Sequence, residues 1–275
     1  MIASIHNARI KHLRQLLTQS KQRKIHQAFV IEGVHLLQMA LQNHYSIQQV
    51  FVPQSQIHDA ELSGCLKQLA SECIEIVEDS IISKMTDLTH GVSVMAQIQM
   101  PPLPDLPHQQ DCVVLETIQD PGNLGTILRT AAATGIRHIV LNNCCADVFS
   151  PKVLRAGMGA HFLLHIYQNI DLIDFLQNFS GCLNVTTLHH ASMNSLYHLD
   201  LTQTNAWVFG NEGAGVSPSI LKLIDYGVHI PMMEKTESLN VAMAATVCLF
   251  EQQRQRIFQA GHIKHSSATL GLKER

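Results

Sequence analysis

Several features that define other classes of protein are missing from this sequence. Only 15% of the 275 residues are charged and 46% are hydrophobic, which excludes a charge-rich disordered chain, and there is no collagen-like glycine repeat. No stretch approaches the roughly 18 uninterrupted apolar residues of a membrane helix. No secretory signal is visible, since no apolar segment precedes a small-residue cleavage site at the N-terminus. We therefore expect a soluble chain with one large globular domain or two ordinary ones, and no membrane partner.

Cysteine pairs with the Cys-x-x-Cys spacing of redox and zinc sites are also absent. The seven cysteines are scattered, and their odd number argues against a framework of disulfides. We expect reduced thiols in the core and a cytoplasmic protein, because such thiols persist in reducing compartments. For the adjacent Cys144 and Cys145, metal binding is the alternative to buried packing.

Histidine is frequent, but its arrangement does not indicate a metal site. His161 and His165 have the spacing of the His-Glu-x-x-His zinc motif, yet Phe162 stands where the catalytic glutamate should be. We therefore predict that the protein uses no metal, with metal binding by these two histidines as the alternative.

Positive charge is concentrated at the N-terminus, although the formal net charge is −3. Residues 1–31 contain six basic residues and no acid, whereas residues 32–87 contain eight acids and two lysines. Such a strip can neutralise nucleic-acid phosphates even in a slightly acidic chain. A solvated helix face is the alternative. The predicted nucleic-acid-binding residues are Arg9, Lys11, Arg14, Lys21, Arg23 and Lys24.

A proline-rich stretch divides the chain. Four prolines within residues 101–107 forbid a helix and favour an extended connector. We predict a smaller domain over residues 1–100, a linker over 101–109, a larger domain over 110–260 and a fraying polar tail over 261–275.

Apolar strands alternate with helices on both sides of this linker. Before it, the pattern predicts strands at 29–31, 49–52, 74–77 and 92–96 and helices near 33–42 and 57–70. After it, the pattern predicts strands at 112–116, 138–141, 162–166, 183–188 and 206–210, and helices at 124–134, 151–157, 170–178, 217–224 and 239–258. This alternation predicts a small α/β domain followed by a parallel sheet covered by helices on both faces.

The loops that leave the strands are the candidate sites, because open parallel sheets bind ligands where their strands end. In the first such loop we expect Asp120-Pro121-Gly122 to turn the chain, Asn123 to cap the next helix and Arg129 to lie on its second turn. Helix N-terminal amides and an arginine both favour an anion such as phosphate. A capped helix with one exposed arginine is the alternative.

A second loop contains glycines at positions 210, 213 and 215, around Glu212. Their missing side chains would let the backbone approach a bound molecule closely. A dinucleotide site is the rival interpretation, but the fingerprint has a further glycine and follows the first strand of its domain. The third loop runs into an apolar helix with Ser238 or Asn240 at its start.

In this order and spacing, the three loops closely resemble the three sequence motifs of the SpoU (TrmH-like) family of RNA 2′-O-ribose methyltransferases, within the SPOUT superfamily. The resemblance covers residues 111 to about 256, and residues 8–98 resemble the ribosomal-protein-like RNA-binding domain of many members. It implies a homodimer that shares its substrate pocket and a deep trefoil knot, an exception to the rule that chains do not thread loops. S-adenosylmethionine would lie in the knot near Gly210, Ile230 and Leu239.

The resemblance also implies the catalytic residues. In the family, the arginine matching Arg129 is assigned as a base assisted by the substrate phosphate. Because arginine stays protonated in proteins, anchoring that phosphate is the alternative role. Asn123 and Asn240 would hold the ribose and the loop geometry, Ser238 would donate to the phosphate or the hydroxyl, and Glu212 would orient Arg129 or Asn123.

These features together predict S-adenosylmethionine-dependent methylation of a ribose 2′-hydroxyl in RNA. Ribosomal RNA is the expected substrate because the N-terminal domain resembles that of the ribosomal-RNA members, and transfer RNA is the alternative. A non-catalytic RNA-binding or ribosome-assembly protein would lack some of the polar residues of the three motifs. A nicotinamide-dependent dehydrogenase would bind its cofactor at the first strand-to-helix turn.

Overall fold

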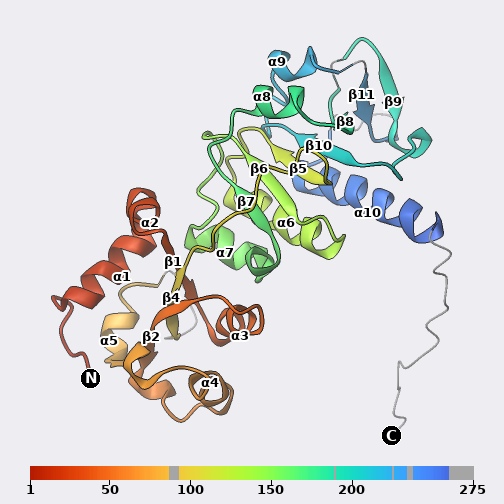
Figure 1. Ribbon diagram of the computed structural model, residues 1–275. Coiled ribbons are helices and arrows are strands. Elements are labelled where there is room, and N and C mark those ends of the chain that lie inside the picture. Colours follow the sequence, from red (N-terminus) through yellow and green to blue (C-terminus); the bar gives the residue numbers. More distant parts are fainter. Residues whose placement is uncertain (87–92, 189, 225, 234–237, 260–275) are drawn as a thin grey trace, which may run out of the picture.

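The computed structural model describes residues 1–86, 93–188, 190–224, 226–233 and 238–259. They form a four-stranded sheet and a five-stranded sheet at opposite ends of the molecule, together with a two-stranded sheet (Figure 1). Among these residues, no helix combines the length and the apolar character needed to cross a bilayer.

The smaller sheet has the strand order β1-β4-β2-β3, in which β2 and β3 are parallel and β4 is antiparallel to its neighbours. Helix α1 buries Ile10, Leu13 and Leu16 in the core on one side of this sheet. The predicted small α/β unit is confirmed, although the strand expected at 92–96 begins only at Met95. Its elements are α1 (Ala8–Thr18), α2 (Ser20–His26), β1 (Ala28–Glu32), α3 (Val34–Gln42), β2 (Ile47–Pro53), α4 (Ala60–Leu66), β3 (Ile74–Val77), α5 (Asp79–Ile82) and β4 (Met95–Gln99).

The larger sheet has the order β7-β6-β5-β10-β8, and all its strands are parallel, as predicted. Its strands β5 and β10 are buried along their whole length, which is typical of a sheet covered on both faces. The elements are β5 (Cys112–Leu115), α6 (Pro121–Ala133), β6 (His138–Leu141), α7 (Pro151–Gly157), β7 (His165–Tyr167), α8 (Leu172–Gln177), β8 (Cys182–Val185), β10 (Asn205–Phe209), α9 (Pro218–Leu221) and α10 (Val241–Gln259).

Alternate residues of β5 enter two different cores. Val113 and Leu115 pack with α6, α7 and α10, whereas Cys112 and Val114 pack with α8 and α9. The two-residue period of a strand therefore places three helices on one face of the sheet and two on the other.

Three parts of this region differ from the prediction. Residues Ala160–Leu163 form a 3₁₀ turn, so the strand expected at 162–166 is reduced to β7. The short strands β9 (Met193–Ser195) and β11 (Gly227–His229) form a parallel pair that periodicity cannot reveal in three residues. The expected tail at 261–275 lies outside the described residues, and the trefoil knot stays a prediction.

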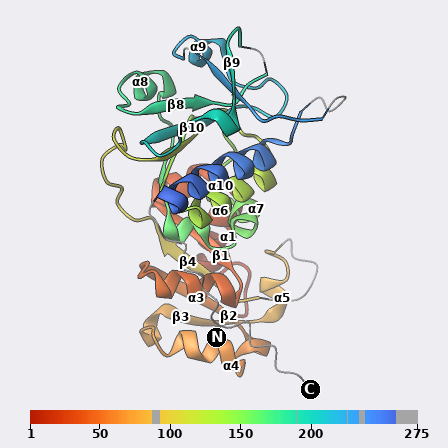
Figure 2. The ribbon, with the colours of Figure 1, turned by 90° about the vertical axis from the view of Figure 1, so that its right-hand side faces the viewer.

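The core between the larger sheet and α6, α7 and α10 continues into the smaller domain. The Phe29 ring on β1 lies 4.8 Å from that of Phe149, and the Tyr45 ring lies 4.9 Å from that of Phe162. The Tyr45 hydroxyl also donates to the backbone oxygen of His161 at 3.1 Å. In Figures 1 and 2, α7 accordingly lies on the side of the larger domain that faces β1 and β4. The two domains therefore share a hydrophobic interface as well as a linker.

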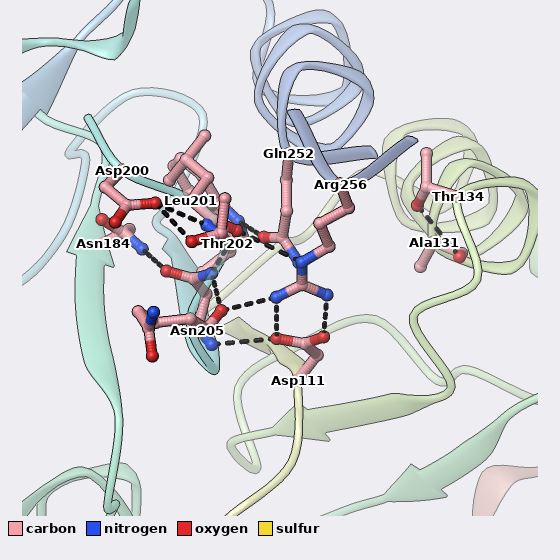
Figure 3. A network of polar contacts seen from close by, with 12 residues as sticks. Asp111, Ala131, Thr134, Asn184, Asp200, Leu201, Thr202, Asn205, Gln252 and Arg256 are labelled. Carbon is pink, nitrogen blue, oxygen red and sulfur yellow. Dashed lines mark hydrogen bonds and ion pairs between the residues drawn. The ribbon is translucent and has the colours of Figure 1, made fainter. Parts of the chain in front are cut away.

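A polar network fixes the C-terminal half of α10 (Figure 3). Arg256 forms an ion pair with Asp111, just before β5, and donates to the backbone oxygens of Leu201 and Gln203. The buried Gln252 accepts a hydrogen bond from the Trp207 indole at 2.5 Å. Helix α10 is thus tied to the edge of the sheet where β5 and β10 begin.

All seven cysteines are free, as expected, but not all belong to the core. Cys65, Cys112 and Cys248 are buried, whereas Cys144 and Cys182 are exposed. Burial raises the pKa of the Cys112 and Cys248 thiols well above the ordinary value, so they stay protonated.

Candidate functional site

The N-cap of helix α6 is Asp120, three residues before the predicted cap at Asn123. Pro121 is its first residue, and the Asp120 carboxylate accepts a hydrogen bond from the Asn123 amide at 2.7 Å. The prediction that Asn123 caps this helix is therefore wrong: proline suits the first helical position, and the preceding aspartate is a good cap. Arg129 consequently lies on the third turn of α6 and not on the second.

Since it does not cap the helix, the Asn123 side chain bridges two other loops. Its Nδ2 donates to Glu212 Oε1 at 3.2 Å, and its Oδ1 accepts from Asn240 Nδ2 at 2.9 Å. The Asn240 Oδ1 in turn accepts from the amides of Ala242 and Met243, so Asn240 caps α10. The three predicted residues Glu212, Asn123 and Asn240 form one hydrogen-bonded chain.

Glu212 also holds the loop that follows β5, residues 116–120, which we name the site loop. Its carboxylate accepts from the backbone amides of Asp120 at 3.0 Å and Gln119 at 3.3 Å. Partial burial raises the pKa of Glu212, but the bonds from Asp120, Asn123 and Gln119 outweigh it, and the net pKa lies below the ordinary value. Glu212 is therefore a charged acceptor that braces the site loop and orients Asn123.

A pocket of about 400 Å³ lies beside the hydrogen-bonded residues Glu212, Asn123 and Asn240. It brings together the three predicted cofactor residues, Gly210, Ile230 and Leu239, and the predicted catalytic residues Glu212 and Ser238. Its volume and mixed lining suit a small molecule with an apolar body and a few polar groups. The remaining lining residues include Thr186, Asn211, Val216, Leu221, Val228, Val241 and Ala244.

Gly210 is required by the packing of its own loop, and not only by the close approach of a bound molecule. A Cβ atom at this position would lie 2.3 Å from the carbonyl carbon of Gly215 and 2.4 Å from the amide nitrogen of Val216. The loop closes on itself through paired backbone hydrogen bonds between Asn211 and Gly215. The glycine is thus required by the close approach of two backbone segments that wall the pocket.

The Arg129 and Ser238 side chains are both exposed, and neither forms a hydrogen bond or ion pair within the described residues. Ser238 lines the pocket, whereas Arg129 projects from α6. An exposed guanidinium without an internal partner is available to an external anion.

The N-terminal basic residues lie on α1 and α2. Lys11, Arg14, Lys21 and Lys24 are exposed there, as is Arg9, which forms an ion pair with Glu75. The prediction for Arg23 needs correction: this residue is only 4% exposed, and its guanidinium binds Asp147 of the larger domain and backbone oxygens at the end of α1. Arg23 is thus engaged inside the protein, and RNA phosphates cannot reach it.

The two histidines with zinc-motif spacing do not meet. His161 is buried, its Nε2 lies 2.8 Å from the Val148 oxygen, and burial lowers its pKa to about 4. His165 is exposed on β7, where it stacks on His138. Over the described residues, no group of three or more potential ligands is placed to hold a metal ion.

Sequence reasoning missed several residues that shape the site. Asn211 accepts from the amides of Gly213 and Ala214 and donates to the Thr117 oxygen, and the Glu116 carboxylate accepts from the Ser217 amide at 2.7 Å. Asparagine two residues before a glycine is a turn signal that could have identified Asn211. The Glu116 bond joins residues far apart in sequence and carries no local signal.

Comparisons with known proteins show which families the two parts of the chain match. Residues 111–250 match the sequence model of the SpoU rRNA Methylase family, and residues 7–96 match that of the MRM3-like substrate binding domain. An uncharacterized tRNA/rRNA methyltransferase of Synechocystis is 37% identical over 93% of this chain and 94% of its own length. A 23S rRNA (guanosine(2553)-2′-O)-methyltransferase of Bacillus subtilis is 29% identical over 90% of this chain and 97% of its own.

Solved structures of RNA methyltransferases have the same fold as this chain. The SpoU methyltransferase AviRb of Streptomyces viridochromogenes, in complex with AdoMet, superposes with a TM-score of 0.80 at 25% identity, covering 92% of this chain and 99% of its own. An RNA 2′-O ribose methyltransferase superposes with a TM-score of 0.77 at 27% identity, covering 93% of this chain and 99% of its own.

Proposed function

The chain belongs to the SpoU rRNA methylase family, and we propose on that premise that it methylates a ribose 2′-hydroxyl of ribosomal RNA. It is an enzyme of the 2′-O-methyltransferase class and depends on S-adenosylmethionine. One observation carries the assignment of the site: the Glu212-Asn123-Asn240 chain joins all three motifs beside one pocket.

The pocket fits the cofactor in size and lining. Val228, Ile230 and Leu239 offer apolar walls for a base, while Ser238 and Glu212 supply polar groups at its margin. The cofactor supplies an electrophilic methyl group on a sulfonium. The protein's part is to hold the ribose hydroxyl in line with that methyl group.

The polar chain has a positioning role in this proposal. Glu212 Oε1 accepts a hydrogen bond from Nδ2 of the Asn123 side chain, and Asn240 Nδ2 donates to Oδ1 of the same side chain. With both ends held, Asn123 keeps one orientation and can present a fixed edge to the ribose. Ser238 lies close enough to the pocket to donate to the substrate.

Arg129 anchors the substrate phosphate. It is exposed, and no carboxylate in the described residues is bonded to it. Guanidinium is too weak an acid to serve readily as a base, so electrostatic binding of a phosphate suits an arginine better than proton abstraction. Its planar guanidinium can donate two parallel hydrogen bonds to phosphate oxygens.

Residues 1–100 supply RNA binding and residues 110–260 supply methyl transfer. Support comes from the exposed cations of α1 and α2, namely Arg9, Lys11, Arg14, Lys21 and Lys24, on the domain that matches a substrate-binding family. Ribosomal RNA is favoured over transfer RNA because relatives along most of the chain are named for 23S rRNA.

The active form is a homodimer in the cytoplasm. An apolar stripe on α10 supports the dimer, since Met243, Phe250 and Ile257 are exposed at intervals of seven residues and so lie on one helix face. Exposed apolar stripes of this kind mark contacts between proteins. The free thiols of the chain are consistent with a reducing compartment.

Total RNA from cells with and without the gene provides the test. We expect one ribosomal-RNA 2′-O-methyl group to disappear with the gene and to return when the purified protein acts on that RNA with S-adenosylmethionine. Loss of a methyl group from transfer RNA alone would transfer the assignment to tRNA. Cofactor binding without any methyl transfer would favour a non-catalytic RNA-binding protein.

A further inference from the structure

One short segment of the larger domain contacts both the site loop and the RNA-binding domain. It comprises residues 142–150, between β6 and α7, and we name it the bridging segment. Its first residues lie against the site loop, and its Asp147 lies against the smaller domain.

The contact with the site loop includes one backbone–backbone hydrogen bond and two bonds from backbone amides to side chains of the bridging segment. The Ala146 amide donates to the Ile118 oxygen at 2.8 Å, and the Ile118 amide donates to the Cys145 sulfur at 3.3 Å. One residue earlier, the Thr117 amide donates to Asn142 Oδ1 at 3.1 Å. The bridging segment thus holds residues 117 and 118, next to the amides that Glu212 binds.

The contact with the smaller domain is an ion pair between the buried Arg23 and the partly buried Asp147. Arg23 Nε donates to Asp147 Oδ2 at 2.9 Å, and the Arg23 and Asp147 side chains are 5% and 19% exposed. The same guanidinium donates to the Leu17 oxygen, at the C-terminal end of α1, at 3.1 Å. Arg23 therefore ties the basic helix α1 to Asp147, one residue from the Ala146 amide.

We infer that Asp147, held by Arg23, is a positioning residue for methyl transfer, through which the RNA-binding domain sets the place of the site loop. This inference rests on the proposed function. The connection is short and runs through hydrogen-bonded backbone, so a change at Asp147 displaces Ile118 and the neighbouring amides that orient Glu212. Small displacements of a positioning group lower the rate of the chemical step without removing the substrate contacts.

A second ion pair between the same domains provides a matched control. Arg155 on α7 forms an ion pair with the buried Glu32 at 3.1 Å, and Thr86 donates to the other Glu32 oxygen. No residue of α7 hydrogen-bonds to the site loop within the described residues. Loss of the Glu32–Arg155 pair therefore weakens domain docking without acting on residues 117 and 118.

The experiment compares Asp147→Asn with Arg155→Gln in the full chain. For Asp147→Asn we expect kcat to fall about tenfold or more, with the KM for RNA within about threefold of wild type. Arg155→Gln should keep the wild-type kcat. If Asp147→Asn folds poorly, Arg23→Lys serves instead, because lysine keeps the charge but cannot bind Asp147 and the α1 oxygens together. Equal losses of kcat in both ion-pair variants, or none in Asp147→Asn, would overturn the inference.

Hydrogen exchange provides a readout that needs neither cofactor nor RNA. In Asp147→Asn, the amides of Thr117, Ile118 and Ala146 should exchange faster than in wild type, whereas in Arg155→Gln they should not. Unchanged exchange in Asp147→Asn contradicts the inference. Because this measurement does not depend on methyl transfer, it separates failure of the positioning role from failure of the proposed function.

Discussion

Asn240 has two roles that a single substitution can separate. Its Oδ1 caps α10 by accepting from the Ala242 amide at 2.9 Å, and its Nδ2 donates to Asn123 Oδ1 at 2.9 Å. Asn240→Asp keeps an oxygen for the cap but replaces the donor with a second acceptor. A carboxylate would then face the Asn123 oxygen, and rotating the Asn123 amide would only turn its oxygen toward Glu212.

The expected magnitudes follow from these contacts. Aspartate is as good an N-cap as asparagine, so the cap is kept, and any fall in the melting temperature should come from the altered contact with Asn123 alone. The lost hydrogen bond contributes about 1 kcal/mol, and the unsatisfied acceptors facing each other cost about a further 1 to 2 kcal/mol. We expect a misplaced Asn123 to withdraw a similar amount, about 2 to 3 kcal/mol, from the stabilisation of the transition state, which lowers methyl transfer about 30- to 150-fold.

Asn240→Ala is the control, because it removes the cap and the link to Asn123 together. It should lower the free energy of unfolding by about 1 kcal/mol and also slow methyl transfer. Thermal unfolding and transfer of tritium from labelled S-adenosylmethionine to RNA measure the two effects. Wild-type turnover by a stable Asn240→Asp protein would show that the hydrogen-bonded chain does not support catalysis.

Three further predictions test the pocket, the anion site and the carboxylate. Gly210→Ala should destabilise the fold by about 1 to 3 kcal/mol and weaken cofactor binding in calorimetry, because its Cβ would meet the Gly215 backbone at 2.3 Å. The control Gly213→Ala, whose Cβ would meet its nearest atom at 3.7 Å, should behave as wild type, and equal effects of the two substitutions would refute the steric argument. Arg129→Ala should abolish tritium transfer while leaving cofactor affinity unchanged, and Arg129→Lys should retain partial activity that does not climb with pH, since a rate rising with pH would indicate a base. The pKa of Glu212 is lowered in the folded protein, so its contribution to stability is present above its ordinary pKa of 4.5 and is lost as the pH falls through the folded-state pKa. The melting temperatures of wild type and Glu212→Gln should therefore differ at about pH 6, and the difference should shrink as the pH falls below 4.5. A difference that stays constant over this range would contradict a charged acceptor.

The parallel sheet was predictable because its strands are apolar runs of ordinary length. Strands such as Cys112–Leu115 and His138–Leu141 appear where alternation with helices places them. The strands Met193–Ser195 and Gly227–His229 were not predicted, since three residues show no period. The early start of α6 was missed because Asp120 and Asn123, three residues apart, can each cap a helix. Pro121 suits the first helical position and so favours Asp120 as the cap, but proline is also common in turns and was interpreted as part of one.

The burial of Arg23 could not have been predicted from its neighbours. Its sequence context is as basic as that of Lys21 and Lys24, and only the contact with Asp147, 124 residues away, distinguishes it. Burial of a charged group is tolerable only with a charged partner and further hydrogen bonds, and no local pattern reveals a partner so distant. Charge patterning therefore located the basic N-terminal strip, but it did not predict the helices α1 and α2 that carry it and could not tell which cation belongs to the domain interface.

The site itself is a consequence of strand order. Strands β5 and β10 are neighbours in parallel register, with Leu115 opposite Phe209, so the loops that follow them leave the sheet side by side. Glu212 can therefore reach the amides of Gln119 and Asp120, although more than ninety residues separate them in sequence. Asn240 is brought close to Asn123 by helix packing. Helix α10, which Asn240 caps, packs along α6, and the Thr130 and Thr246 hydroxyls of the two helices lie 3.1 Å apart. Three motifs far apart in the chain meet because one strand pair and one helix pair bring their ends together, and the chemistry of each motif is complete only at that junction.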